Sequence, residues 1–433
     1  MDPLLDFLRF LNRSPTVFHA AKEISNRLAE ADFTPLREEE KWVLEPGKGY
    51  FLIRGDSLVA AFRIPKKEPK SATILASHID SPCLKLKPFP EHESGEMVRL
   101  NTEVYGAPLL HTWLDRDLSI SGRVTGMNQS TLHSQIVNLD DSPVIIPSLA
   151  IHLDRTVTEK GLLVHKQDHL KPIFSLTLKG GEKQLEERLC VAANIDKLLS
   201  FDLFLTPVEI PHFVGFNNEM IAAYRLDNLT TAYAALFGML QSVPRSDTLQ
   251  IALFWDHEEI GSTSYVGADS LFANQILERI CLSFKMDRED YYRLKSRSHC
   301  ISGDLTHGFN PNFTDKYDPQ NSPYLGKGPV IKFNANQKYA TSSTSAAAVL
   351  RVAEKHKIPM QKFANRSDIP SGSTVGSIMA ANLGVSTVDV GIAGWGMHSI
   401  RETVASKDEL SLCELFKALL DEKLLSEANS WNT

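Results

Sequence analysis

Cysteine is scarce in this sequence, and its pattern excludes two kinds of site. Only five of the 433 residues are cysteines, and no two of them form a C-x-x-C pair. An odd number of cysteines argues against a disulfide framework, and the absence of close pairs argues against zinc held by cysteines. We therefore expect reduced thiols and a cytoplasmic location.

Long apolar runs and blocks of basic residues are also missing. No run approaches the roughly 18 apolar residues of a membrane span. The apolar start of the chain carries Asp2, Asp6 and Arg9, which predicts an amphipathic helix and not a signal peptide. Lysine and arginine number 46 against 53 acidic residues, a net charge of −7. Nucleic-acid binding needs a basic surface, so we expect neither nucleic acid nor membrane as a partner.

Apolar strands alternate with helical segments over much of the chain. Apolar runs at residues 71–77, 248–255 and 386–392 predict buried strands. Helical periodicity covers 3–31, with a break at Ser14 and Pro15, and recurs at 229–240, 346–356 and 409–425. This alternation predicts an α/β fold with a mixed, largely parallel sheet flanked by helices.

The stretch from 91 to 219 has a different pattern of apolar and turn-forming residues. Short alternating segments at 118–124, 134–137 and 172–178 are separated by Gly, Pro, Asn and Asp, which predicts antiparallel β structure. We therefore expect a β-rich domain at 91–219, inserted into a catalytic α/β domain formed by residues 1–90 and 220–433.

Each of the three predicted strands is followed by groups that can bind metal. His78 and Asp80 follow the first, Asp256 to Glu259 follow the second, and His398 follows the third after a Gly-rich loop. Ligands in open α/β sheets bind outside the carboxyl ends of strands. Adjacent carboxylates such as Glu258 and Glu259 face opposite sides of extended backbone, so one can ligate metal while the other accepts a proton.

Asp227 and Asp304 complete the candidate set, although each has a simpler interpretation in isolation. Asp227 begins a predicted helix and could be its N-cap, and Asp304 could be a turn residue. Together the candidates supply two histidines, three carboxylate ligands and one spare glutamate. This set suits two zinc ions about 3.5–4 Å apart that share a carboxylate. Nitrogen and oxygen ligands also suit cobalt or manganese.

At this point the sequence resembles a known family, the aspartyl aminopeptidases, which are cytosolic dinuclear zinc peptidases. The resemblance rests on segments that run in order along nearly the whole chain, namely SHIDSPCLKLKP at 77–88, HTWLDRDLSISGRV at 111–124, IPSLAIHL at 146–153, DHEEIGS at 256–262, GPVIKFNANQKYA at 328–340, RSDIPSGSTVG at 366–376 and MHSIRE at 397–402. Jointly these segments are far more specific than any one motif.

The resemblance implies a role for each matching residue. His78 and Asp304 would bind one zinc ion, Glu259 and His398 the other, and Asp227 would bridge them. Glu258 would be the general base, and Asp80 would orient His78. Lys332 and His307 would line the pocket for the substrate's first side chain. His152, from the inserted domain, would reach the active site of a neighbouring subunit in an assembly of twelve.

The function implied is hydrolysis of the first peptide bond of a peptide by a zinc-activated water, with a preference for N-terminal Asp or Glu. Three alternatives remain open: a dinuclear zinc aminopeptidase of neutral or broad specificity, a zinc amidohydrolase or deacylase acting on small N-acyl compounds, and a non-catalytic scaffold. The presence of every expected ligand and of Glu258 argues against the scaffold.

Overall fold

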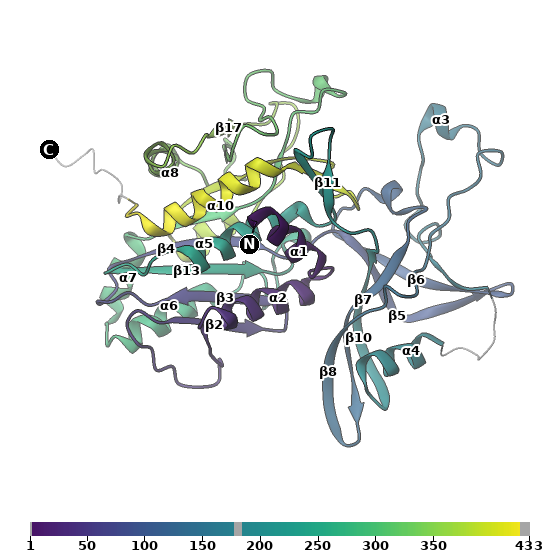
Figure 1. The fold of residues 1–433 in the computed structure, drawn as a ribbon, viewed down its shortest axis with the longest axis horizontal. Helices are drawn as coiled ribbons and strands as arrows, with labels where there is room; N and C mark the ends of the chain where they lie inside the picture. The colour runs from purple at the N-terminus through teal and green to yellow at the C-terminus, as the bar shows by residue number, and fades with distance from the viewer. Residues whose placement is uncertain (1, 177–183, 425–433) are drawn as a thin grey trace.

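The computed structural model describes residues 2–176 and 184–424, and its largest element is a nine-stranded mixed sheet (Figure 1). In spatial order its strands are β1 (Thr34–Pro35), β2 (Gly49–Arg54), β3 (Leu58–Arg63), β13 (Thr248–Trp255), β4 (Ser71–His78), β14 (His299–Gly303), β18 (Ser386–Gly391), β16 (Val330–Lys332) and β17 (Gln361–Phe363). The central strands β13, β4, β14 and β18 are mutually parallel. The predicted α/β fold with a largely parallel central sheet is confirmed.

Helices cover both faces of this sheet. One face packs against α1 (Pro3–Asn12), α2 (Val17–Glu30), α5 (Leu226–Gln241), α8 (Ser343–Lys355) and α10 (Ser406–Asp421). The other packs against α6 (Phe272–Ser283), α7 (Arg288–Ser296) and α9 (Val375–Leu383). The expected break near Pro15 separates α1 from α2. Within the described ranges, none of the helices combines the length and apolar character needed to cross a membrane.

The packing of strand β13 between two hydrophobic cores explains why its sequence is mostly apolar. Ile251, Leu253 and Trp255 belong to one hydrophobic core, whereas Ala252 and Phe254 belong to the other. Successive side chains of a strand point to opposite faces, so a strand covered by helices on both sides is apolar at most positions. The buried Gln250 is the exception within this strand's interior, and its amide donates to the backbone oxygens of Val243 and Leu420. Every residue of β13 is buried.

A second, six-stranded sheet lies to one side of the first (Figure 1). Its order is β8 (Thr131–Asn138), β7 (Leu118–Asn128), β10 (Lys197–Pro207), β5 (Cys83–Ser94), β6 (Met97–Tyr105) and β9 (Ile173–Ser175), accompanied by η1 (Leu110–Trp113), α3 (Val157–Lys160) and α4 (Gln184–Ala193). Its strand pairs are antiparallel. Residues 177 and 178 of the segment predicted at 172–178 lie outside the described residues, as does residue 425 of the last predicted helix.

A smaller five-stranded sheet connects the segments around the candidate residues. It consists of β11 (His212–Val214), β12 (Met220–Ala223), β20 (Glu402–Ala405), β19 (Ala393–Trp395) and β15 (Thr306–His307). Short 3-10 helices at η2 (Glu258–Ile260) and η3 (Thr314–Lys316) complete the described elements. Since β12 leads into α5 while β20 follows the His398 loop, their pairing draws Asp227 and His398 together.

Candidate metal centre

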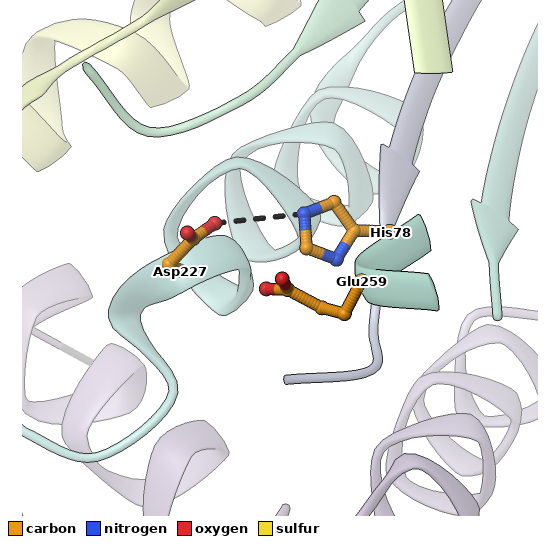
Figure 2. A group of neighbouring side chains, drawn as sticks. All are labelled: His78, Asp227 and Glu259. Carbon is orange, nitrogen blue, oxygen red and sulfur yellow. Dashed lines mark ion pairs between the residues drawn. The ribbon is translucent and has the colours of Figure 1, made fainter. Parts of the chain in front are cut away.

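Three of the predicted ligands form one compact group. A ring nitrogen of His78, a carboxylate oxygen of Asp227 and a carboxylate oxygen of Glu259 lie within 4.8 Å of one another. Figure 2 shows these three side chains converging from the end of β4, the start of α5 and the turn after β13. The carboxyl ends of the parallel strands therefore meet at one edge of the sheet, as the sequence predicted.

Asp227 lies between the two histidines. Its Oδ1 is 3.5 Å from Nε2 of His78, and its Oδ2 is 3.4 Å from Nε2 of His398. Nε2 of His398 is also 3.3 Å from Oε2 of Glu259. Each oxygen of Asp227 thus faces a different histidine, which is the arrangement of a carboxylate that bridges two metal ions.

The remaining two candidates lie beside His78. Oδ2 of Asp304 is 3.7 Å from Nε2 of His78, and Oε2 of Glu258 is 3.9 Å from the same atom. The structure therefore brings together all five predicted ligands and the predicted base. The first and last of these residues, His78 and His398, are more than 300 positions apart in the chain.

Both histidines hold their rings in the same way. Nδ1 of His78 is 3.1 Å from the backbone oxygen of Asp80, and Nδ1 of His398 is 3.0 Å from the backbone oxygen of Ala107. In metal sites a ligating histidine commonly donates its second ring N–H to a carbonyl or carboxylate, which fixes the tautomer and directs the other nitrogen at the metal. Nε2 of each ring points into the carboxylate group here.

Asp227 does not act as a helix N-cap. The first turn of α5 departs from helical geometry at Asp227 (φ −83°, ψ 103°), and the cap residue before the helix makes no side-chain capping bond. The Asp227 carboxylate is directed toward the histidines, while its backbone N–H donates to Glu402. The carboxylate of Asp227 therefore lies in the cluster formed with the two histidines.

The residues fit a pair of cations. Asp227 Oδ1 and Glu259 Oε1 are buried without a hydrogen-bond partner among the described residues. Buried polar atoms are rarely left unpaired, and a buried carboxylate without a partner is costly. Two carboxylates with unpartnered oxygens beside two oriented histidines, with no thiolate among these ligands, match the nitrogen and oxygen donor set of catalytic zinc.

Burial and like charges shift the pKa values of two groups in the cluster. Burial, with the neighbouring Asp304, Asp80 and Asp227 carboxylates, raises the pKa of Glu258 to about 8. Although burial alone would lower it, the Asp227 and Glu259 carboxylates raise the pKa of His398 to about 10. Bound cations would favour the carboxylate form of Glu258 and the neutral form of His398.

Asp80 organises the turn that carries the two glutamates. Its Oδ1 lies 3.3 Å from Nδ1 of His78, and its two oxygens accept the backbone N–H groups of Glu258 and Glu259 at 3.2 and 3.1 Å. The Tyr105 hydroxyl donates to Asp80 Oδ2 at 2.6 Å. The sequence analysis did not identify Tyr105, because nothing in its β-strand surroundings indicates a contact with a residue 25 positions earlier.

Glu402 is a second contact that sequence reasoning missed. Its Oε2 accepts the backbone N–H of Asp227 at 2.8 Å, and its Oε1 accepts that of His398 at 2.7 Å. The sequence feature that could have identified Glu402 is its position in the MHSIRE segment, four residues after His398.

The proposed pocket residues differ in exposure. Lys332 is 2% exposed, and its Nζ donates to Asp304 Oδ1 and to the backbone oxygen of Leu305, both at 2.7 Å. Despite its burial, the Asp304 carboxylate raises the pKa of Lys332. His307 is exposed at the end of β15, with its ring 6.2 Å from that of Phe363. His152 is exposed in a turn between β8 and α3, and the ion pairs of the cluster do not include it.

The chain matches known proteins along most of its length. Residues 10–420 match the family model described as aminopeptidase I zinc metalloprotease (M18). The chain is 39% identical to "Probable M18 family aminopeptidase 2" of Clostridium novyi over 421 residues, covering 95% of this chain and 97% of the relative.

Solved structures of similar fold cover almost the entire chain. The structure titled "Cryo-EM structure of the Ape4 and Nbr1 complex" superposes with a TM-score of 0.92 at 33% identity, covering 98% of this chain and 87% of the other. The structure titled "Structure of S. cerevesiae mApe1 dodecamer" gives a TM-score of 0.84 at 26% identity and covers 96% of each chain.

Proposed function

The chain belongs to the aminopeptidase I zinc metalloprotease (M18) family and is a metallo-aminopeptidase, and from this premise we propose that it prefers peptides beginning with Asp or Glu. The observation that carries the proposal is a buried lysine, Lys332, whose ammonium group reaches the metal ligand Asp304. A cation at this place puts positive charge next to the reacting end of a bound peptide.

Two zinc ions per subunit are the proposed cofactor, with cobalt or manganese as chemical alternatives. His78 and Asp304 would hold one ion, Glu259 and His398 the other, and Asp227 both. The two histidine Nε2 atoms, 3.5 and 3.4 Å from opposite oxygens of Asp227, support this division. When bound, such ions polarise the scissile carbonyl and lower the pKa of a coordinated water from 15.7 to about 7.

Glu258 is the proposed general base. Its carboxylate is mostly buried and lies beside His78, but Glu259 and not Glu258 approaches His398. This leaves Glu258 free to take a proton from the attacking water and to deliver it to the leaving amine. Such proton transfer contributes typically ~10²–10⁴-fold to the rate. Asp80 acts as a positioning residue for both His78 and the Glu258 backbone.

Lys332 would provide the charge that recognises an acidic first side chain. An ammonium group has three N–H donors, and two of those of Lys332 are used within the protein. We propose that the third meets a substrate carboxylate, since a hydrogen bond between charged partners is about twice as strong as a neutral one. His307, exposed at the end of β15, is proposed as a second contact in this pocket.

The same geometry favours a second candidate, an M18 aminopeptidase of neutral or broad specificity. Lys332 is 2% exposed, and its charge is paired with Asp304 at 2.7 Å. A charge that is already compensated attracts a second carboxylate less strongly. The protein as a whole is also acidic, with a net charge of −7, so the preference depends on this one pocket.

We further propose a homo-oligomer, a dodecamer by analogy with the S. cerevisiae mApe1 relative, in the cytoplasm. Leu149, Ile151 and Leu153 are 62%, 47% and 74% exposed on either side of His152. Clustered exposed apolar side chains are typical of an interaction surface. A subunit docked there would allow His152 to enter a neighbouring active site, where it would stabilise the tetrahedral oxyanion. Light scattering in solution measures the predicted mass.

A substrate panel tests the proposed preference. Aspartyl, glutamyl and leucyl p-nitroanilides are compared by kcat/KM, with and without a zinc chelator. The proposal expects aspartyl and glutamyl substrates to be cleaved at least about tenfold faster than leucyl, a difference of about 1.4 kcal/mol in transition-state stabilisation. Equal rates on all three, all abolished by the chelator, would instead support broad specificity.

A further inference from the structure

Glu402 holds the backbone of two metal ligands from different parts of the chain. Its two carboxylate oxygens accept the N–H groups of Asp227 and His398 at 2.8 and 2.7 Å, and the residue is 2% exposed. Burial of these two hydrogen bonds excludes water that would compete for them. One side chain therefore links the backbone of Asp227 to that of His398.

The conformation of His398 shows why such a contact matters. His398 has a φ of 68°, in the left-handed region that L-residues other than glycine rarely adopt. A residue is kept in this region only where its surroundings fix it. The contacts that fix His398 are its N–H to Glu402, its Nδ1 to the Ala107 oxygen, and its own backbone oxygen, which accepts the N–H of Leu109.

The two proposed metal sites differ in how much they depend on this contact. His78 stands at the end of the central strand β4 and is 1% exposed, and Asp304 directly follows the neighbouring central strand β14. The His398 side chain lies on a loop and is 26% exposed. The site of Glu259 and His398 therefore relies on a loop that Glu402 anchors, whereas the site of His78 and Asp304 is built on the sheet.

We propose that Glu402 is a positioning residue that makes the Glu259–His398 site a tight metal site, and that its removal weakens this site more than the His78–Asp304 site. The inference rests on the proposed two-metal centre. Side chains that orient metal ligands from outside the coordination shell typically contribute 10–100-fold to metal affinity. Removing Glu402 also leaves two buried N–H donors unpaired, which favours a different arrangement of the His398 loop.

The test is a zinc titration of the metal-free full-length chain in competition with a chromogenic chelator. Wild type, Glu402→Ala, Glu402→Gln and the control Glu409→Gln are compared. Glu409 is equally buried, on α10, and its carboxylate lies beside Cys413 and away from the cluster. We expect Glu402→Ala to raise one of the two zinc dissociation constants by about 10–100-fold. The other dissociation constant should stay within about threefold of the wild-type value. Glu409→Gln should resemble wild type.

Glu402→Gln keeps the shape of the side chain and covers the case in which Glu402→Ala does not fold. An amide has only one acceptor oxygen, so one N–H contact remains and the loss should be about tenfold. A cobalt titration followed by visible absorption should show the second site filling at higher cobalt in both variants. Unchanged affinities at both sites, or equal weakening of both, would overturn the proposal.

Failure of this inference can be distinguished from failure of the proposed function. A wild-type chain that binds two zinc ions but shows no preference for acidic substrates would overturn the proposed specificity and leave the Glu402 comparison valid. A wild-type chain with that preference, whose zinc affinities do not change in Glu402→Ala, would overturn the role of Glu402 alone.

Discussion

Nζ of Lys332 donates a hydrogen bond to Oδ1 of Asp304 at 2.7 Å, while Oδ2 of the same carboxylate faces Nε2 of His78 at 3.7 Å. The residue proposed to recognise substrate is therefore in direct contact with a proposed metal ligand. Changes at Lys332 should affect both substrate preference and the metal site, and the two effects can be separated by measuring both.

Replacing Lys332 with alanine should lower kcat/KM for aspartyl and leucyl substrates alike, with a further loss on aspartyl. The common loss arises because Asp304 loses its charged partner, and the additional loss on aspartyl, about 10–100-fold, reflects the missing charge that faces the substrate. The exposed Lys362 on the adjacent strand β17 offers a matched control. Equal losses on the two substrates would favour the broad-specificity candidate.

Replacing Glu258 with glutamine should abolish turnover but retain the metals. The contacts of Asp227 are with His78 and His398 and do not include Glu258, so glutamine at position 258 leaves them intact. The glutamine amide cannot accept a proton from water. We expect kcat to fall by ~10²–10⁴-fold, with zinc content by elemental analysis unchanged. The exposed Glu289→Gln serves as control. Near-normal activity of Glu258→Gln would contradict its role as base.

Replacing Tyr105 with phenylalanine removes only the hydroxyl that donates to Asp80 at 2.6 Å. Asp80 should then hold His78 and the Glu258–Glu259 turn less firmly, and we expect kcat/KM to fall about tenfold. Circular dichroism should show an unchanged fold. Tyr292→Phe, at a tyrosine that is 50% exposed, is the matched control. Identical kinetics in Tyr105→Phe and wild type would show that Asp80 does not depend on this contact.

Activity should be lost as the pH falls. Burial raises the pKa of Glu258 to about 8 in the metal-free site, and bound cations lower it by favouring the carboxylate. A general base works only when ionised, so its active form is present above its pKa and disappears below it. We therefore expect the acid limb of kcat/KM to lie below pH 8, with zinc content measured at each pH. A rate that rises toward low pH would contradict this role.

The candidate ligands were predictable because they follow the carboxyl ends of apolar strands. His78 and Glu259 follow β4 and β13, which are adjacent and parallel, so the sheet brings them together. Asp227 was ambiguous from sequence, because an acidic residue at a helix start is ordinarily a cap. Its contacts with His78, His398 and Glu402 join segments that are far apart in the chain, and no local sequence pattern indicates them.

The supporting contacts could not be predicted for a related reason. Tyr105 reaches Asp80 only because β6 pairs with β5, which starts beside the cluster. Lys332 is recognisable by family resemblance as a pocket residue, but its burial and its bond to Asp304 follow from packing between strands far apart in sequence. A lysine is ordinarily expected at the surface, so the sequence does not indicate that Lys332 is buried.

The most direct test of the central claim is an anomalous-scattering map from crystals of the zinc-loaded protein, recorded above and below the zinc absorption edge. The account predicts two zinc peaks per subunit, about 3.5–4 Å apart, on either side of the Asp227 carboxylate. One peak should adjoin His78 and Asp304, and the other Glu259 and His398. A single peak, or two peaks that do not share Asp227, would contradict the two-metal centre.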